Sequence, residues 1–347
     1  MISNPSVAAM LLRVAAKGLA AALLAASLPC LGAAQAHTSS RGAVTPVLTQ
    51  ANAALQAGEA DKALALLQSA PQSSDAAEAA NIECRVRLTL EQWEAAVTKC
   101  QQAVGVDDQS SNYHLWLGRA LGEKADHASF LTAYSLAKRT RAEFEEAVRL
   151  DPRNADALAD LGEFYEQAPG VVGGGIDKAE EIAARLDTLD PSRAYGLRAE
   201  IAEQSKDYGG AEREYRQAIS ASRHPASHWI SLASFYRRRK RWTEMEAAVH
   251  SGEMAAQRDK AENAHAGVAL YDGASLLTET HRDPALAAKM FDDYLAGTAK
   301  TEEAPAFVAH LRLARLKDQL GDPAAASRER AAALAMANEY KPAAGAQ

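Results

Sequence analysis

The segment of the chain whose composition most suggests chemistry is residues 170–175, GVVGGG. Its glycines have the spacing of the phosphate-binding loop G-x-x-x-x-G-K-[ST], in which the lysine reaches the phosphates and the hydroxyl holds magnesium. Ile176 and Asp177 stand at those two positions here, and Asp177 would repel a phosphate. No predicted strand precedes the segment, and G-x-G-x-x-G is absent. Asp177 and Glu180 are instead typical of a capping box at the start of a helix.

Two histidines have the spacing of metal ligands. His224 and His228 are four residues apart, as zinc ligands on a helix are. Pro225 lies between them at a predicted first helical turn, and no H-E-x-x-H sequence is present. A surface pair at a helix start is therefore the favoured interpretation. No arrangement of Ser, His and Asp, or of Cys and His, stands out. The sequence predicts no enzyme, no cofactor and no metal.

The first 36 residues predict export. Arg13 and Lys17 precede an acid-free apolar run at 18–28, and AQA follows at 34–36. This order is typical of a secretory signal peptide cleaved near Ala36. The apolar run is about half as long as a transmembrane helix requires. An uncleaved anchor is the alternative.

Cleavage would leave a mature protein that is periplasmic or secreted, although Met10 is an alternative start for the chain. Its first residue would be His37, and amino-terminal histidines bind copper in some secreted enzymes that also have a second, well-placed histidine. We favour a flexible linker over residues 37–43. No later segment is long and apolar enough to span a bilayer, so we expect no membrane span in the mature chain.

Composition favours helices. The 347 residues are 48% hydrophobic, 24% charged and only 6% aromatic. Alanine is abundant, and alanine loses no side-chain entropy in a helix. The net charge of −7 argues against nucleic-acid binding, which requires a basic surface.

A period of about 34 residues then emerges. The sequence HLWLGRAL at 114–121 is followed by FEEAVRLDPRN at 144–154, and ALADLGEFY at 157–165 by LDTLDPS at 186–192. DYGGAEREYRQAI follows at 207–219. These segments resemble the tetratricopeptide repeat, W-x-x-L-G-x-x-Y, then A-x-x-x-F, then P.

The resemblance implies an all-α, right-handed superhelical solenoid over residues 44–340, followed by a disordered tail at 341–347. Each repeat is a hairpin of helices A and B, with a small residue at the eighth position facing an alanine at the twentieth. We place eight repeats, at about 44–77, 77–110, 111–154, 155–191, 192–225, 226–259, 268–301 and 307–340. The terminal repeats are degenerate, as expected where one face meets water.

Two repeats carry insertions between helices A and B, near 124–136 and 169–176. In the third repeat the insertion is helical, because apolar residues recur there at intervals of three or four. We expect Asp126 to cap a helix B that is about 15 Å longer than usual.

That extension displays Phe130, Leu131 and Tyr134. We predict that Val171 and Val172, on the next insertion, fold back onto Phe130 and Tyr134. The resulting ridge would be a structural brace or, alternatively, an edge for docking a partner.

The resemblance places Cys84 and Cys100 at the eighth and twenty-fourth positions of the second repeat, which face each other across the hairpin. An oxidising compartment would allow a disulfide that closes a loop of about 15 residues. Two buried thiols are the alternative. The basic run RRRKRW at 237–242 is interpreted as a solvated turn, or alternatively as a docking patch for an acidic partner or anionic lipid.

By the same resemblance, positions two, five, nine, twelve and thirteen of each repeat point into a concave groove. The groove would be acidic in the middle and basic at its rims. The main candidates for partner contact are Asn112, Arg119, Glu123, Asp156, Glu163, Glu166, Glu200, Glu203, Arg237 and Arg238. The carboxylate clamp of some family members does not map onto these positions.

The expected function is a non-enzymatic scaffold that binds a protein or peptide in this groove. The alternative is a small-ligand-binding accessory subunit of a transport or envelope assembly system. The sequence leaves the partner and the oligomeric state open, because a fold does not determine what binds to it.

Overall fold

The computed structural model describes residues 46–70, 75–259, 266–298 and 300–341. The predicted signal peptide, the 37–43 linker with His37, and nearly all of the 341–347 tail lie outside the described residues. Within the described part every regular element is a helix. None of these helices combines the length and the apolar composition that a membrane crossing requires.

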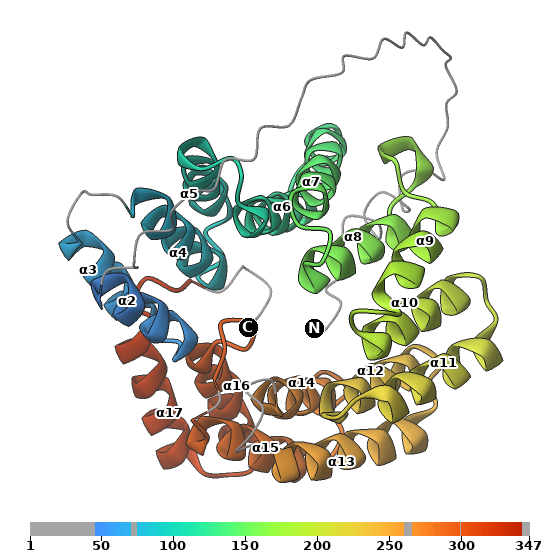
Figure 1. The fold of residues 1–347 in the computed structure, drawn as a ribbon. Helices are drawn as coiled ribbons and strands as arrows, with labels where there is room; N and C mark the ends of the chain where they lie inside the picture. The colour runs from blue at the N-terminus through green and yellow to red at the C-terminus, as the bar shows by residue number, and fades with distance from the viewer. Residues whose placement is uncertain (1–45, 71–74, 260–265, 299, 342–347) are drawn as a thin grey trace, which may run out of the picture.

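The helices form eight consecutive antiparallel hairpins, which confirms the predicted all-α solenoid (Figure 1). The pairs are α2 (Pro46–Gln56) with α3 (Ala60–Ser69), α4 (Ala76–Thr89) with α5 (Trp93–Val106), α6 (Ser111–Asp126) with α7 (Phe130–Leu150), α8 (Ala155–Gln167) with α9 (Ile176–Leu186), α10 (Pro191–Gln204) with α11 (Tyr208–Ala221), α12 (Ala226–Arg238) with α13 (Trp242–Asp259), α14 (Ala266–Glu279) with α15 (Pro284–Ala296), and α16 (Ala306–Gln319) with α17 (Pro323–Met336).

Small residues let the two helices of a hairpin approach closely. A methyl group at Gly118 of α6 would overlap the Phe144 ring of α7. One at Gly162 of α8 would lie 3.0 Å from Ile182 of α9 and 2.5 Å from Leu197 of α10. Carbon atoms of separate side chains do not approach so closely, so the glycines set the distance between the helices. This is the role that the eighth position of the repeat implies.

Aspartates begin several of the helices. The Asp190, Asp283 and Asp322 carboxylates accept backbone N–H groups of the first turns of α10, α15 and α17, at 3.1, 3.0 and 2.9 Å. A proline follows each of them, where its missing N–H costs nothing. The D-P pairs in the sequence therefore mark helix starts.

The turns between helices A and B show where the insertions lie. Six hairpins have a residue of positive φ soon after helix A, at Gly58, Glu91, Lys206, Lys240, His281 and Gly321, and the α14–α15 turn has a second one at Asp283. The α6–α7 turn has no such residue, and the α8–α9 connection has one only within its insertion, at Gly173. These are the two hairpins with insertions, so the extra residues replace the short turn of the other six.

The first insertion lengthens both of its helices. Helix α6 runs through Asp126, and α7 begins at Phe130 after Ser129. Asp126 is therefore the last residue of α6, and its predicted role as the cap of helix B is wrong. The chain continues the α6 helix through Ala125 and Asp126 because Ala125 is buried in the hairpin core.

The second insertion folds only in part against the α6/α7 hairpin, which carries the first insertion. In the short 3₁₀ turn η1 (Gly170–Val172), Val172 is fully buried in the same apolar cluster against which Tyr134 packs, and its carbonyl accepts Arg141 Nη1 at 3.2 Å. Val171 is 67% exposed, and Phe130 and Leu131 are 42% and 79% exposed. The predicted cover by Val171 is therefore not formed.

Backbone hydrogen bonds explain the conformation of this glycine loop. The N–H groups of Gly173, Gly174 and Gly175 donate to the carbonyls of Gly170, Pro169 and Tyr165, at 3.0, 3.3 and 2.8 Å. These bonds fix the loop to the end of α8 and turn Val171 outward. The same amides are then unavailable to a phosphate.

The start of α9 also differs from the prediction. Gly175 is the N-cap, and no side chain accepts an N–H group there, so Asp177 and Glu180 do not form a capping box. Asp177 lies in the first turn, where its charge suits the helix dipole.

The solenoid closes on itself. Helices α2 and α3 lie beside α16 and α17, so that the eight hairpins form a ring (Figure 1). We call this contact between the first and last hairpins the seam. Its buried apolar side chains include Leu48, Leu55, Phe307 and Ala333. The expectation that the terminal faces meet water is wrong, because each buries the other.

Polar contacts accompany the apolar ones at the seam. Glu302, in the segment before α16, accepts Gln56 Nε2 at 2.9 Å and Arg85 Nε at 2.9 Å. The Arg85 and Glu302 side chains are only 12% and 9% exposed. Tyr340 donates to Glu91 at 2.9 Å. Buried charges of this kind require their partners, so the two chain ends are matched in detail.

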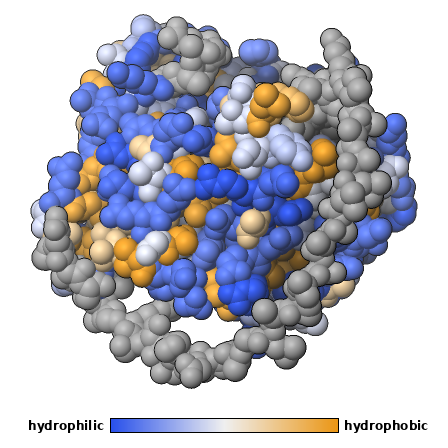
Figure 2. All heavy atoms as spheres, turned by 90° about the horizontal axis from the view of Figure 1, so that it is seen from above, coloured by the Kyte–Doolittle hydropathy of each residue, from blue (hydrophilic) through white to orange (hydrophobic). Residues whose placement is uncertain are grey.

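Figure 2 shows the face that lies at the top of Figure 1, where apolar residues occur in small areas between polar ones.

The seam can be tested at Phe307. Phe307→Ala should lower the free energy of unfolding by about 3–5 kcal/mol, because a buried ring is lost. It should also increase the radius of gyration measured by small-angle X-ray scattering in native buffer. Phe291→Ala in α15, equally buried but away from the seam, should destabilise the protein without expanding it. Equal radii for both variants would contradict a ring held at the seam.

The structure joins Cys84 of α4 to Cys100 of α5 in a disulfide, with Cα atoms 5.2 Å apart. Replacing both cysteines by alanine should lower the free energy of unfolding by about 3 kcal/mol, because the unfolded chain gains freedom. A thiol reductant should lower the urea midpoint of the wild-type protein and leave that of the variant unchanged. A wild-type midpoint that does not respond to reductant would contradict the bond.

Candidate functional site

The ring encloses a cavity of about 820 Å³. Most of its described lining comes from the first helices of five hairpins, α4, α6, α8, α14 and α16. These are the helices whose inner faces the repeat pattern assigns to the groove. The closed ring therefore converts an open groove into a chamber.

The described lining carries nine carboxylates and four arginines, with no lysine, histidine or cysteine. The carboxylates are Glu91, Glu123, Asp126, Asp160, Glu163, Asp272, Glu279, Glu302 and Glu303, and the arginines are Arg85, Arg119, Arg312 and Arg315. The chamber is thus more acidic than the protein as a whole.

Protein groups already hold three of these arginines. Arg85 and Arg119 lie over the Trp116 ring, at 5.0 and 4.6 Å from its centre. Arg119 also donates to Asp160 at 2.6 Å. Arg312 lies 5.2 Å from the centre of the Tyr271 ring and donates to the Ser275 hydroxyl. The charges of these three arginines therefore interact mainly with other side chains of the protein.

The predicted groove residues divide into three groups. Arg119, Glu123 and Glu163 line the chamber. Asn112 and Asp156 lie exposed at the starts of α6 and α8, and Asp156 pairs with Arg193 at 2.5 Å.

The remaining residues lie farther along the ring. Arg237 pairs with the chamber residue Glu279 at 2.7 Å. Arg238 donates to both oxygens of Glu203, at 2.8 and 2.7 Å. The predicted basic rim is thus neutralised by neighbouring carboxylates.

Glu163 and Glu166 of α8 and Glu200 and Glu203 of α10 form what we call the acidic cluster. Their charges act on one another, and Arg238 from α12 is the cation that acts on Glu166 and Glu200. Glu163 accepts Gln167 Nε2 at 2.9 Å. Glu166 is only 8% exposed, and within the described part of the chain its carboxylate has no hydrogen bond or ion pair.

Burial dominates the electrostatics of the cluster. It raises the pKa of Glu166 to about 7, and the charges of Glu163 and Glu203 add to the rise. Burial, followed by Glu163 and Glu166, raises the pKa of Glu200 well above its ordinary value. The pKa of Glu163 is raised by burial and by Asp160. Ionisation of this cluster at neutral pH therefore opposes folding.

Another carboxyl group with a raised pKa, that of Asp126, lies on α6. Burial, with a smaller contribution from Glu123, raises the pKa of Asp126 to about 7. Its Oδ1 atom is buried and has no hydrogen-bond partner among the described residues. Asp126 and Glu123 both line the chamber, so its acidic character extends from α8 to α6.

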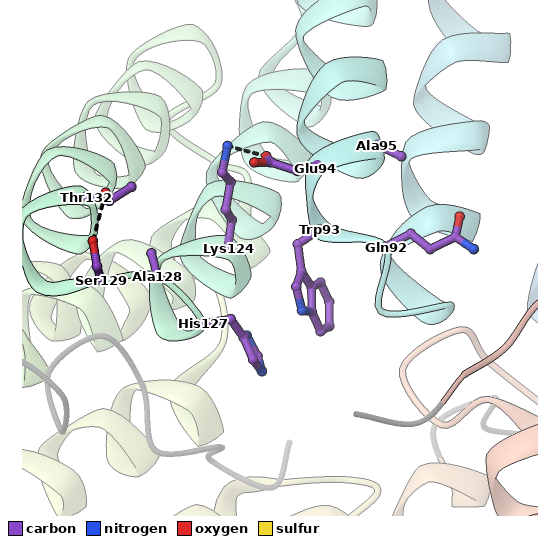
Figure 3. A pocket seen from close by; sticks show the side chains of 9 residues that line it. All are labelled: Gln92, Trp93, Glu94, Ala95, Lys124, His127, Ala128, Ser129 and Thr132. Carbon is purple, nitrogen blue, oxygen red and sulfur yellow. Dashed lines mark hydrogen bonds and ion pairs between the residues drawn. The ribbon is translucent and has the colours of Figure 1, made fainter. Parts of the chain in front are cut away.

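An outer hollow of about 600 Å³ lies where the α4–α5 and α6–α7 turns meet (Figure 3). Trp93 and His127 stack there with ring centres 5.0 Å apart and an interplanar angle of 21°. Lys124 pairs with Glu94. Trp93 also borders the inner chamber, so its ring separates the two spaces.

The other sequence motifs carry no site in the described structure. His224 Nδ1 lies 3.5 Å from Asp259, and the described residues contain no group of three potential metal ligands. Residues 239–241 of the basic run form the turn between α12 and α13. Arg241 pairs with Glu212 at 2.6 Å, and Arg239 lies 4.1 Å from the centre of the Tyr208 ring.

The sequence interpretation missed the contribution of the degenerate repeats. The groove positions that it used for repeats three to six also select chamber residues elsewhere. They give Arg85, Leu88 and Thr89 in repeat two, Asp272 and Glu279 in repeat seven, and Val308, Leu311 and Arg315 in repeat eight. The signal was therefore present in the repeat register. Glu302 and Tyr340 fall outside that pattern.

The raised pKa values in the acidic cluster predict that the stability of the folded protein depends on pH. The pKa of Glu166 is about 7 in the folded protein and 4.5 ordinarily, so the folded state binds the proton more tightly. Stability should fall as pH rises from about 4.5 to about 7. Glu166→Gln should raise the free energy of unfolding at pH 8 by up to about 3 kcal/mol and have little effect at pH 4.5.

Urea denaturation at the two pH values measures this difference. Glu180→Gln, an exposed position on α9, should change neither value. A Glu166→Gln variant that is no more stable than wild type at pH 8 would show that the carboxylate is not strained.

No protein-family model matches the chain, and neither does any curated protein sequence. Among solved structures, TTC0263, a thermophilic tetratricopeptide protein of Thermus thermophilus, is similar over 55% of this chain and 96% of its own, with 19% identity and a TM-score of 0.46. pilF of Pseudomonas aeruginosa is similar over 63% and 90%, with 19% identity and a TM-score of 0.37. The helix hairpins of this chain therefore establish its fold by themselves, and these similarities do not identify what it binds.

Proposed function

We propose that the protein is a non-enzymatic scaffold that binds a peptide segment of a partner protein inside the ring. The observation that carries this proposal is the chamber inside the ring, where the inner faces of five hairpins meet around about 820 Å³. Polar, charged and aromatic groups line it, and such a mixture suits a peptide's backbone and side chains better than an apolar molecule. A periplasmic or secreted location, proposed from residues 1–36, completes the proposal.

A small-ligand-binding accessory subunit is the second candidate. The closure of the ring favours it, because the volume of the chamber lies within the range of small-molecule pockets, about 300–1,000 Å³. Such pockets are mostly apolar with a few polar groups, however, whereas this lining combines apolar and aromatic side chains with nine carboxylates and four arginines. The peptide therefore remains the first candidate.

Catalysis is less well supported. Carboxyl groups with raised pKa values, such as Asp126 and Glu166, suit general acid catalysis. The described lining offers them no histidine, cysteine or lysine, and the Ser275 hydroxyl donates to the Tyr271 carbonyl at 2.8 Å. The described chamber thus contains no serine, cysteine or lysine that is activated by a neighbouring base.

A steric block of the chamber tests the proposal. Thr278 lines the chamber, and Thr278→Trp would fill part of it. Thr98→Trp, on the exposed face of α5, is a matched control because both hydroxyls donate to the carbonyl four residues earlier. Affinity capture from the exported protein fraction, followed by mass spectrometry, should recover partners with wild type and Thr98→Trp and lose them with Thr278→Trp.

Capture of the same proteins by all three forms would contradict binding inside the ring. Native mass spectrometry of the purified protein distinguishes the second candidate. A bound mass below about 1 kDa that Thr278→Trp excludes, with no partner captured, would favour a small ligand.

A further inference from the structure

Two buried polar atoms of the chamber wall have no hydrogen-bond partner among the described residues. They are the Oδ1 atom of Asp126 on α6 and the Oγ1 atom of Thr140 on α7. Both residues line the chamber, and Thr140 is only 2% exposed. Buried polar groups normally have partners, because a group left without one costs free energy. A donor from outside the described structure would therefore be stabilised beside these atoms.

The packing of the hairpin brings the two side chains to the same gap. A methyl group at Gly122 of α6 would lie 3.7 Å from Thr140 Cγ2, so Gly122 faces Thr140. Asp126 follows Gly122 by four residues and lies on the same face of α6, about 6 Å along its axis. Side chains lean toward the N-terminus of their own helix, and α6 and α7 are antiparallel. The Asp126 side chain therefore leans toward Gly122, and the Thr140 side chain leans toward Asp126.

No described lysine or arginine neutralises Asp126. Its pKa is raised by burial and by the charge of Glu123, and no cation among the described residues acts on it. Lys124, the nearest lysine on α6, is directed to Glu94 in the outer hollow (Figure 3). Glu123 also lines the chamber, and His127 is the positive group that acts on it. The gap thus has two carboxyl groups and a hydroxyl, with little positive charge beside them.

A primary ammonium group matches this set. It has three N–H donors and no acceptor, and the gap offers it two carboxylates and one hydroxyl. Phe144, one turn along α7 from Thr140, and Trp93, stacked on His127, also line the chamber. Such rings favour both the methylene groups and the charge of an alkylammonium. A metal ion is a poorer match, because the described residues contain no group of three potential metal ligands.

We propose that Asp126 and Thr140, together with Glu123, form a subsite of the chamber that binds a primary ammonium group. The source of this group is a lysine side chain of a bound peptide or a free alkylamine. The inference deepens the proposed function and rests on it, because it places part of the bound segment inside the ring.

Isothermal titration calorimetry at pH 8 tests the subsite with three probes. Two are acetylated tripeptide amides, Ala-Lys-Ala and Ala-norleucine-Ala, which differ by the ammonium group alone. The third is butylamine, which carries the ammonium of the lysine side chain without a backbone. Asp126 is mostly ionised at this pH, because its pKa is about 7. The wild type should bind the lysine peptide at least tenfold more tightly than the norleucine peptide.

Matched variants locate the preference. Asp126→Asn/Thr140→Val removes one charge and one hydroxyl and keeps both side-chain shapes. Asp177→Asn/Thr98→Val makes the same changes at exposed positions of α9 and α5 and is the control. The control should keep the tenfold preference for lysine, and the subsite variant should lose it. Thermal unfolding at pH 8 should show that the subsite variant is at least as stable as the wild type, because a buried charge and a buried hydroxyl without partners are removed.

Tighter binding of the lysine peptide than of butylamine would assign the subsite to a peptide, and the reverse order to a free amine. Equal binding of the lysine and norleucine peptides to the wild type would overturn the proposal. So would an equal preference for lysine in the wild type and the subsite variant. Should the double variant unfold, Thr140→Val alone carries the same test, with Thr98→Val as its control.

The same measurements separate this proposal from the proposed function. If Thr278→Trp abolishes partner capture while the wild type binds both peptides equally, the scaffold function stands and the ammonium subsite fails. If the preference for lysine depends on Asp126 and Thr140 while no captured partner depends on the chamber, the subsite stands and the scaffold function fails.

Discussion

The packing of the first hairpin against the last is the constraint on which the interior depends. Without the seam, the inner faces of α4 and α16 would belong to opposite ends of an open superhelix. With it, Gln56 and Glu302 meet across 246 positions of sequence, and five hairpins share one chamber. A methyl group at Gly58 would lie 2.7 Å from the Ala306 backbone nitrogen, so the chain ends approach as closely as the helices of one hairpin do.

Ion pairs between successive hairpins give the interior its character. Arg119 of α6 reaches Asp160 of α8, and Arg238 of α12 reaches Glu203 of α10. Each pair joins the first helices of two neighbouring hairpins. Each pair also neutralises an arginine that the sequence alone would place at the basic rim of the groove. The lining of the chamber therefore keeps more carboxylates than arginines. The electrostatic potential inside the ring is therefore set by the pairing of its charges rather than by their number.

The sequence predicts the parts of this structure that repeat. Gly118 and Gly162 identify the close contacts within hairpins, and positions two, five, nine, twelve and thirteen of each repeat identify the inner face. Closure is different in kind, because it depends on small angles between hairpins that add up over eight units. The seam residues Glu302 and Tyr340 also lie outside the repeat pattern, so no periodicity reveals them. Asp126 and Val171 depart from expectation because insertions break the periodicity locally.

Closure of the ring also helps the protein to tolerate the repulsion among the carboxylates of the acidic cluster. In an open solenoid each hairpin is stabilised only by its neighbours, and the end hairpins have one neighbour each. In the ring every hairpin has two, and the cluster on α8 and α10 lies across the ring from the seam (Figure 1). Repulsion among Glu163, Glu166 and Glu200 is then opposed by contacts on both sides.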